Sequence, residues 1–249
     1  MESLKQWLDN HCICNAEFLS GPIKAVVVNF HGLNSTYRNS ASDLEITLAE
    51  NNILVLSPYY GPWGWMNRLS RQLVDEVVEK AYKYFNLSES IPLIANGASM
   101  GGLAAFLYTR YGKKTPIGCC TLFPVCDLTY HYTERPDVPI SVTYAFYGYK
   151  ENFEDVLIEH SPIEQAEKLP NIPYFVIHGD FDKQVDKSHS DRMVEKLRNL
   201  GKSVQYMEVA KMGHGGINMP LSVKENMVKF IVDLANKYPF SNNTFVSKI

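Results

Sequence analysis

Short apolar runs rich in β-branched residues alternate with longer amphipathic stretches along most of the chain. This alternation is typical of parallel strands joined by crossover helices. It predicts an α/β fold with a mostly parallel sheet and helices on both faces. Strands are expected at 24–30, 53–57, 92–97, 117–123, 173–178 and 203–209. Helices are expected at 41–51, 67–85, 100–111, 186–200 and 221–238.

One segment interrupts this alternation. Residues 124–170 are rich in Tyr, Pro and acidic residues, and they separate two predicted strands by more than a crossover helix needs. Long insertions at the end of a strand often form lids, and we expect a lid here. No linker or internal repeat divides the rest, so residues 1–249 are predicted to form a single domain. The polar tail at 241–249 is expected to be frayed.

The composition narrows the class of protein. With 45% hydrophobic and 20% charged residues, the sequence is not that of a disordered chain. A net charge of −3 without a basic run offers little to nucleic acid or to anionic membranes. No apolar run approaches the ~20 residues of a membrane span, and the first residues do not resemble a signal peptide, so a cytoplasmic protein is expected. Five cysteines without paired Cys-x-x-Cys spacing indicate reduced thiols.

The motif Gly97-Ala98-Ser99-Met100-Gly101 lies between a predicted strand and a predicted helix. It matches G-x-S-x-G, a strand-to-helix turn that raises the serine hydroxyl above the sheet. Glycines flank such a serine because larger side chains would collide with the neighbouring strand and helix. An ordinary turn that contains Gly and Ser is the alternative. The chain lacks the glycine patterns of P-loops and of dinucleotide-binding folds, which excludes both.

A serine hydroxyl needs a base and an acid before it acts as a nucleophile. His214 lies in a glycine-rich loop between the last predicted strand and the last helix, and it is the predicted base. Four other histidines are interpreted as loop residues exposed to water: His11, His131, His160 and His189. The loop that follows strand 173–178 supplies three candidate acids, namely Asp180, Asp182 and Asp186. The resulting order of nucleophile, acid and base is that of α/β-hydrolases.

The segment that holds the candidate acids also permits a metal interpretation. His178, Asp180 and Asp182 alternate at the end of the strand, as metal ligands can. No further His or Cys cluster accompanies them, so this alternative is the weaker one. We therefore expect neither a metal nor a cofactor.

Two backbone amides are predicted to bind the oxyanion that forms during hydrolysis. The turn at His31-Gly32 follows the first predicted strand and aims the Leu33 amide into the crevice, opposite the Met100 amide. The His31 side chain is interpreted as a brace for this loop and as a candidate pocket residue. Aromatic residues border the same crevice, and packing of their rings in the core is the alternative to a pocket wall. The pocket candidates among them are Tyr59, Tyr60, Trp63, Trp65 and Tyr147.

With these motifs the chain resembles the α/β-hydrolase superfamily over about residues 24–238. Within it, the chain is similar to serine esterases of the dienelactone-hydrolase and prolyl-oligopeptidase-like groups. The resemblance implies that the acid is Asp182, from the pattern H-G-x-x-D-x-x-V, and that the base is His214. It also implies an oxyanion loop at 31–33. Asp186 departs from the pattern, since these families usually have proline there.

Together these features predict a cofactor-free serine hydrolase that cleaves a small carboxylic ester, with a short-chain or aromatic group, through an acyl-enzyme. The catalytic residues would be Ser99, Asp182 and His214. The expected partner is the small-molecule substrate, with no nucleic acid and no membrane, and a homodimer stays open. An oligopeptidase or acylaminoacyl peptidase is one alternative, and a catalytically dead hydrolase fold used for binding is another.

Overall fold

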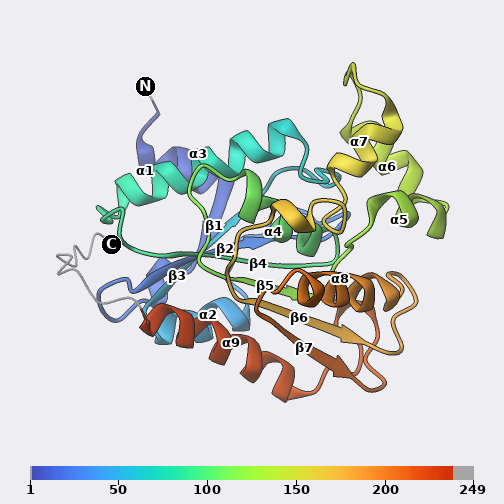
Figure 1. Ribbon diagram of the computed structural model, residues 1–249. Coiled ribbons are helices and arrows are strands. Elements are labelled where there is room, and N and C mark those ends of the chain that lie inside the picture. The colour runs from blue at the N-terminus through green and yellow to red at the C-terminus, as the bar shows by residue number, and fades with distance from the viewer. Residues whose placement is uncertain (1, 238–249) are drawn as a thin grey trace.

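Within residues 2–237, which the computed structural model describes, seven strands form one sheet (Figure 1). Their order is β1-β3-β2-β4-β5-β6-β7, and every pair is parallel except β1 with β3. The strands are β1 (Cys12–Cys14), β2 (Ala25–Phe30), β3 (Ile53–Pro58), β4 (Leu93–Ala98), β5 (Cys119–Leu122), β6 (Tyr174–Gly179) and β7 (Val204–Val209). The predicted α/β fold with a mostly parallel sheet is therefore confirmed.

The helices also follow the sequence pattern. They are α1 (Leu4–His11), α2 (Asp43–Glu50), α3 (Arg68–Tyr84), α4 (Met100–Tyr111), α5 (Leu128–Glu134), α6 (Val138–Ala145), α7 (Phe153–Glu159), α8 (Ser188–Asn199) and α9 (Leu221–Asn236). Each predicted strand and helix is present, with ends within two residues of those expected. The frayed tail predicted at 241–249 lies outside the described residues. No helix of residues 2–237 is long and apolar enough to cross a membrane.

Two elements at the start of the chain were not predicted. Strand β1 has three residues, too few to display a period of two. It pairs with the edge of the sheet through Cys12 opposite Pro58 and Cys14 opposite Leu56. Helix α1 is short, and the side chain of Ser3 caps it by accepting a hydrogen bond from the Gln6 amide.

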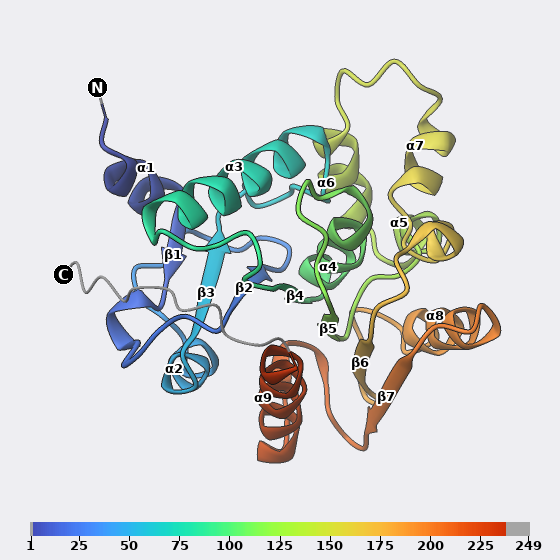
Figure 2. The same cartoon turned by 60° about the vertical axis from the view of Figure 1, so that its left-hand side comes forward.

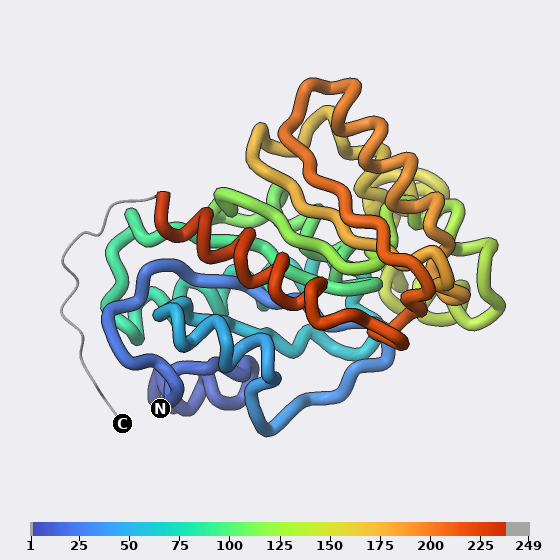
Figure 3. The backbone as a smooth tube through the Cα atoms, turned by 90° about the horizontal axis from the view of Figure 1, so that it is seen from below, coloured from blue at the N-terminus to red at the C-terminus, as the bar shows by residue number. Residues whose placement is uncertain are grey.

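Alternate side chains of β2 enter two separate hydrophobic cores. Val26, Val28 and Phe30 pack with residues of α3 and α4, while Ala25 and Val27 pack with residues of α2 and α9. Figure 2 shows α1 and α3 above the sheet and α2 and α9 below it. Figure 3 shows α2 and α9 side by side on the lower face. Because both faces are covered, the site must form at the carboxyl ends of the strands.

The predicted insertion contains α5, α6 and α7 and packs on the loop after β3. The Trp65 indole Nε1 donates a hydrogen bond to Ser141 Oγ on α6, at 3.0 Å. The Asn67 side-chain amide donates to the Ala145 carbonyl oxygen at 2.7 Å. Trp65 is fully buried. The loop and the insertion thus form one packed unit beside the carboxyl ends of the strands.

Glu45 on α2 is a buried carboxylate held by several donors. It closes a capping box with Ser42, and it accepts hydrogen bonds from the Arg38 guanidinium at 2.6 and 3.0 Å and from the Ser57 hydroxyl. Burial opposes ionisation, but Arg38, Ser42 and Ser57 outweigh it and lower the pKa of Glu45 to about 2. The ionised side chain therefore stabilises the folded state above its ordinary pKa of 4.5, and this contribution falls as pH drops from 4.5 towards 2.

Replacement of Glu45 by Gln is expected to lower the free energy of unfolding at pH 7 by about 2–3 kcal/mol, because Arg38 then loses its partner. The variant should also lose less stability than the wild type between pH 4.5 and pH 3. Urea unfolding at pH 7, pH 4.5 and pH 3 measures the two effects. Glu50→Gln, at an exposed position of the same helix, is the control. Equal stability losses in the two variants would contradict the role given to Glu45.

Candidate active site

Ser99 occupies a strained turn between β4 and α4. Its backbone has φ 58° and ψ −124°, in a region that L-residues rarely adopt. A Cβ atom at Gly97 would lie 2.2 Å from the Gly101 carbonyl oxygen, and one at Gly101 would lie 2.1 Å from the Phe30 carbonyl oxygen. Only glycine fits at these two positions, which explains the motif's spacing.

Backbone hydrogen bonds hold the strained serine in place. The Ser99 N–H donates to the Leu122 carbonyl oxygen on β5 at 3.1 Å. In turn, the Ser99 carbonyl oxygen accepts from the amides of Gly102 at 2.9 Å and Val125 at 3.2 Å. The side-chain hydroxyl is thereby left at the carboxyl edge of the sheet.

His214 follows β7 and links the other two predicted catalytic residues. Its Nε2 lies 3.0 Å from Ser99 Oγ, and its Nδ1 lies 2.7 Å from Asp182 Oδ2. The imidazole packs at 4.5 Å against the ring of Phe123. Gly215 and Gly216 have φ of 68° and 83°, so the loop after the histidine needs glycine to turn away. The structure thus brings Ser99, His214 and Asp182 together in one hydrogen-bonded chain.

Asp182 is oriented by the turn that follows β6. Its Oδ1 accepts hydrogen bonds from the amides of Gln184 at 2.8 Å and Val185 at 3.0 Å, which leaves Oδ2 facing His214. The Asp182 side chain is only 1% exposed. Burial by itself would raise its pKa, but the nearby His178 N–H and the hydrogen bonds from His214 and the two amides hold the pKa of Asp182 well below its usual value. The carboxylate is therefore ionised at neutral pH.

The other two candidate acids have different contacts. Asp180 is exposed and accepts a hydrogen bond from the Lys211 amide. Asp186 was expected to begin the next helix, yet α8 begins at Ser188, whose amide donates to Asp186 at 2.9 Å. Of the three candidates, Asp182 is the one hydrogen-bonded to His214.

His178 is a buried brace that the sequence analysis did not identify. Its Nε2 lies 3.1 Å from the Val185 carbonyl oxygen, which can only accept, so this nitrogen carries the proton. The same nitrogen lies 3.6 Å from Asp182 Oδ2, and Nδ1 bonds to the Ser190 hydroxyl at 2.7 Å. His178 is thus a positioning residue for Asp182. The histidine that opens the H-G-x-x-D pattern was the available signal.

The two predicted oxyanion amides have no competing partner. Within residues 2–237, neither the Leu33 N–H nor the Met100 N–H donates a hydrogen bond to the protein. Met100 begins α4, so its amide has no acceptor inside that helix. His31 braces the loop as expected, because its Nδ1 lies 2.9 Å from the Gly32 carbonyl oxygen and its ring stacks on Tyr60 at 4.0 Å.

A cavity of about 400 Å³ opens at Ser99. Its lining comprises Gly32, Leu33, Asn34, Ala98, Ser99, Leu122, Phe123, Arg135, Gln184, His214, Gly215, Gly216 and Met219. Arg135, from the segment after α5, and Gln184 were not singled out from the sequence. An adjoining cavity of about 500 Å³ shares Gly32, Asn34, Ala98 and Leu122 with it.

None of the six predicted pocket side chains is among the residues that line the Ser99 cavity. His31 and Tyr59 line the adjoining cavity, whereas Tyr60 and Trp65 are buried in the core. Trp63 and Tyr147 line a surface groove with Ile140 and Tyr144 on α6. The pocket prediction is therefore wrong for Tyr60 and Trp65. Tyr60 packs against Phe30 and His31, and Ser141 of the insertion covers Trp65.

Three of the four histidines expected in water are buried, so that interpretation is wrong for them. His131 and His189 contact Glu134 at 2.6 and 2.7 Å. His160 accepts a hydrogen bond from Arg71 at 2.6 Å, and burial together with this cation lowers the pKa of His160 to about 3. His11 is half-buried and stacks on Trp7 at 4.1 Å. The partners of His189 and His160 come from distant parts of the chain, namely Glu134 in the insertion and Arg71 on α3, which the local sequence does not reveal.

A nucleophile-elbow serine at the carboxyl edge of a mostly parallel sheet defines the α/β-hydrolase fold. The sequence profile of the prolyl oligopeptidase family matches residues 71–238. The chain therefore belongs to this family of serine hydrolases, which confirms the resemblance seen in the sequence.

Similar proteins include peptidases and a lipase. An uncharacterized peptidase of Bacillus subtilis (strain 168), YtmA, is 25% identical over 167 residues, which are 64% of each chain. The acylaminoacyl peptidase of Pyrococcus horikoshii has a TM-score of 0.75 at 13% identity, over 90% of this chain and 40% of that one. A monoacylglycerol lipase of Paleococcus ferrophilus has a TM-score of 0.63 at 14% identity, over 92% of this chain and 99% of that one. The chain thus spans less than half of the acylaminoacyl peptidase.

Proposed function

We propose that the chain hydrolyses small carboxylic esters through an acyl-enzyme intermediate. The observation that carries this proposal is the hydrogen-bonded chain from Asp182 through His214 to Ser99, which ends at a cavity. A buried carboxylate that orients an imidazole against a hydroxyl is the arrangement that activates serine nucleophiles. Leu33 lines the same cavity and Met100 directly follows Ser99, and neither backbone amide donates a hydrogen bond within residues 2–237.

In the proposed mechanism, Ser99 Oγ attacks the ester carbonyl carbon while His214 Nε2 takes the hydroxyl proton. The Leu33 and Met100 amides donate to the oxyanion of the tetrahedral intermediate. Its collapse breaks the ester C–O bond, and His214 returns the proton to the departing alcohol. Water then attacks the acyl-enzyme with the same base, which releases the acid and free Ser99. Asp182 keeps the proton on His214 Nδ1 and stabilises the imidazolium.

Two observations support an ester substrate. The cavity of about 400 Å³ suits a small ligand. A lipase is also among the structures that share this fold, with a TM-score of 0.63. Peptide hydrolysis is the second candidate, because the family name and YtmA both point to peptidases and the same groups can cleave amides.

Matched substrates separate these candidates. We expect a larger rate enhancement on a 4-nitrophenyl ester than on the 4-nitroanilide of the same acyl group, each measured as kcat/KM against its uncatalysed rate. A larger enhancement on the anilide would overturn the ester assignment and favour the peptidase.

A fluorophosphonate probe tests whether the site is active at all. We expect the probe to label Ser99 in the folded protein, because His214 activates the hydroxyl. Intact-mass analysis and peptide mapping measure the modification. Folded protein that stays unlabelled would instead identify a binding protein on a hydrolase fold.

A further inference from the structure

Arg135 is the only Asp, Glu, Lys or Arg among the described residues that line the Ser99 cavity. It follows α5 directly, in the predicted insertion. The other lining residues are glycines, apolar or amide side chains, Ser99 and His214. No carboxylate of the described residues faces this cavity. Within residues 2–237, the charge that a substrate in this cavity would meet on its wall is therefore that of the Arg135 guanidinium.

Some N–H groups of the Arg135 guanidinium have no acceptor within residues 2–237. A guanidinium has five N–H groups. Its Nε and Nη2 donate to the two carboxylate oxygens of Asp137, at 3.0 and 2.6 Å, and its Nη1 donates to Gln184 Oε1 at 3.2 Å. Two N–H groups, one on each Nη, donate to nothing within residues 2–237. They are available to an acceptor in the cavity.

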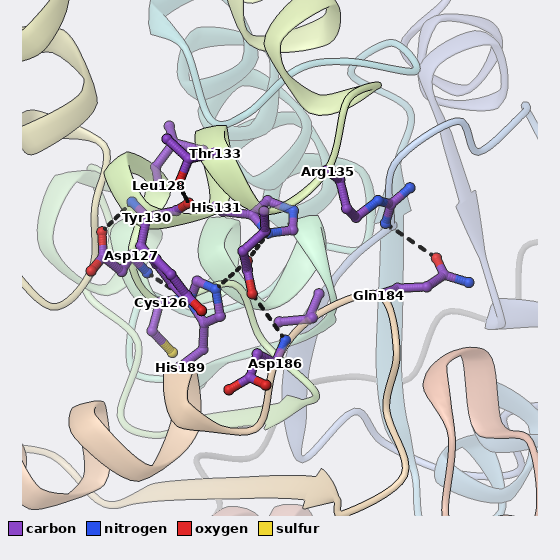
Figure 4. A network of polar contacts seen from close by, with 12 residues as sticks. Cys126, Asp127, Leu128, Tyr130, His131, Thr133, Arg135, Gln184, Asp186 and His189 are labelled. Atoms are coloured by element: carbon purple, nitrogen blue, oxygen red, sulfur yellow. Dashed lines mark hydrogen bonds and ion pairs between the residues drawn. The ribbon is translucent and has the colours of Figure 1, made fainter.

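A buried clamp fixes the backbone next to Arg135. The preceding residue, Glu134, bonds to His131 Nδ1 at 2.6 Å and to His189 Nε2 at 2.7 Å. Its other carboxylate oxygen accepts from the Asp186 amide at 3.3 Å, just after the turn that holds Asp182. Figure 4 shows this clamp, with the Arg135 side chain extending away from it towards Gln184. The insertion is thus tied to the acid loop where Arg135 meets the cavity.

Two histidines and a glutamate, as in this clamp, could hold a metal ion. The protonation of His189, however, does not fit a metal ligand. His189 Nδ1 lies 3.2 Å from both the Cys126 and the Asp127 amide nitrogens, which can only donate. This Nδ1 therefore carries no proton, and Nε2 carries the proton that it donates to Glu134. A histidine that binds a metal must offer a lone pair at that nitrogen. The cluster is consequently a structural clamp for the segment that holds Arg135.

We propose that Arg135 binds a carboxylate on the substrate, so that the preferred esters are those whose acyl or alcohol part carries a negative charge. This inference rests on the proposed ester hydrolysis at Ser99. Guanidinium groups bind carboxylates through charge-assisted hydrogen bonds, often two at once. Asp137 orients the guanidinium from one side, but its side chain is 49% exposed, so water screens its charge.

Two pairs of esters test this proposal. In the first, 4-nitrophenyl butyrate is compared with mono-4-nitrophenyl succinate, in which a carboxylate replaces the terminal methyl group. In the second, phenyl acetate is compared with 4-acetoxybenzoate. The ratio of kcat/KM for the charged ester to that for the neutral ester is measured in wild type, Arg135→Gln and Arg135→Lys. Arg198→Gln, at an exposed position on α8, is the control for the same change of charge.

We expect Arg135→Gln to lower this ratio about tenfold or more in at least one pair, Arg135→Lys to lower it less, and Arg198→Gln to leave it unchanged. The wild-type ratio should also fall with added NaCl. Unchanged ratios in both pairs overturn the role of Arg135, provided that the variant still reacts with the fluorophosphonate probe. If Arg135→Gln does not fold, Arg135→Lys decides: a lowered ratio in at least one pair supports the role of Arg135, and unchanged ratios in both pairs overturn it. Wild-type protein that neither reacts with the probe nor cleaves any ester overturns the proposed function instead.

Discussion

Replacing Ser99 with alanine is expected to reduce kcat by roughly 10⁶-fold, the loss found when the nucleophile of a serine protease is removed. His214 Nε2 contacts the Ser99 hydroxyl at 3.0 Å, so the variant leaves the base without a proton to take. Alanine retains the Cβ atom that the strained turn already accommodates, and the fold should survive. Steady-state ester hydrolysis measures the loss, and thermal unfolding measures the stability.

The matched control is Ser222→Ala, at an exposed position on α9. It should hydrolyse esters at the wild-type rate. Ser99 would not be the nucleophile if the Ser99→Ala protein kept a tenth of the wild-type turnover after repeated purification.

The second large effect concerns the acid. Replacing Asp182 with Asn is expected to lower kcat by about 10⁴, as the equivalent change does in a serine protease. The Asn Oδ1 can still accept from the Gln184 and Val185 amides, so the turn should hold. Its Nδ2, however, would donate a hydrogen bond to His214 Nδ1, and the imidazole proton would then lie on Nε2. A protonated Nε2 cannot accept the proton of the Ser99 hydroxyl.

Asp180→Asn and Asp186→Asn are the controls, because both carboxylates are exposed and accept hydrogen bonds from the backbone amides of Lys211 and Ser188, respectively. Each should cost far less than the Asp182 change in kcat measured on the same ester. If kcat instead falls strongly in the Asp180 or Asp186 variant and stays nearly normal in the Asp182 variant, the catalytic acid is reassigned and Ser99 remains the nucleophile.

Most of the fold could be predicted because a buried parallel strand has a local signature. The run 24–30 is apolar on both faces, since β2 contributes to two cores at once. Ser99 could be recognised for a similar reason. Gly97 and Gly101 are required by close backbone contacts, and both lie within two residues of the nucleophile. Such local constraints are visible in a single sequence.

The features that could not be predicted depend on distant partners. His189 lies in a polar stretch, and its burial depends on Glu134, 55 positions away. Trp65 belongs to an aromatic loop whose sequence predicts a pocket wall, but α6 covers it through Ser141, 76 positions further along the chain. Arg135 gave no local signal, because its place at the Ser99 cavity results from the packing of the whole insertion.

The burial of Trp65 also makes this residue an optical reporter. Its indole is fully buried, bonds to Ser141 on α6 and lies 5.8 Å from the ring of His131 on α5. Trp7 and Trp63, by contrast, are half-buried. In a variant with phenylalanine in place of Trp7 and Trp63, all tryptophan fluorescence would come from Trp65, at the contact between the sheet and the insertion. The wavelength of that emission would follow the hydration of this contact during ligand binding or unfolding, separately from the rest of the molecule.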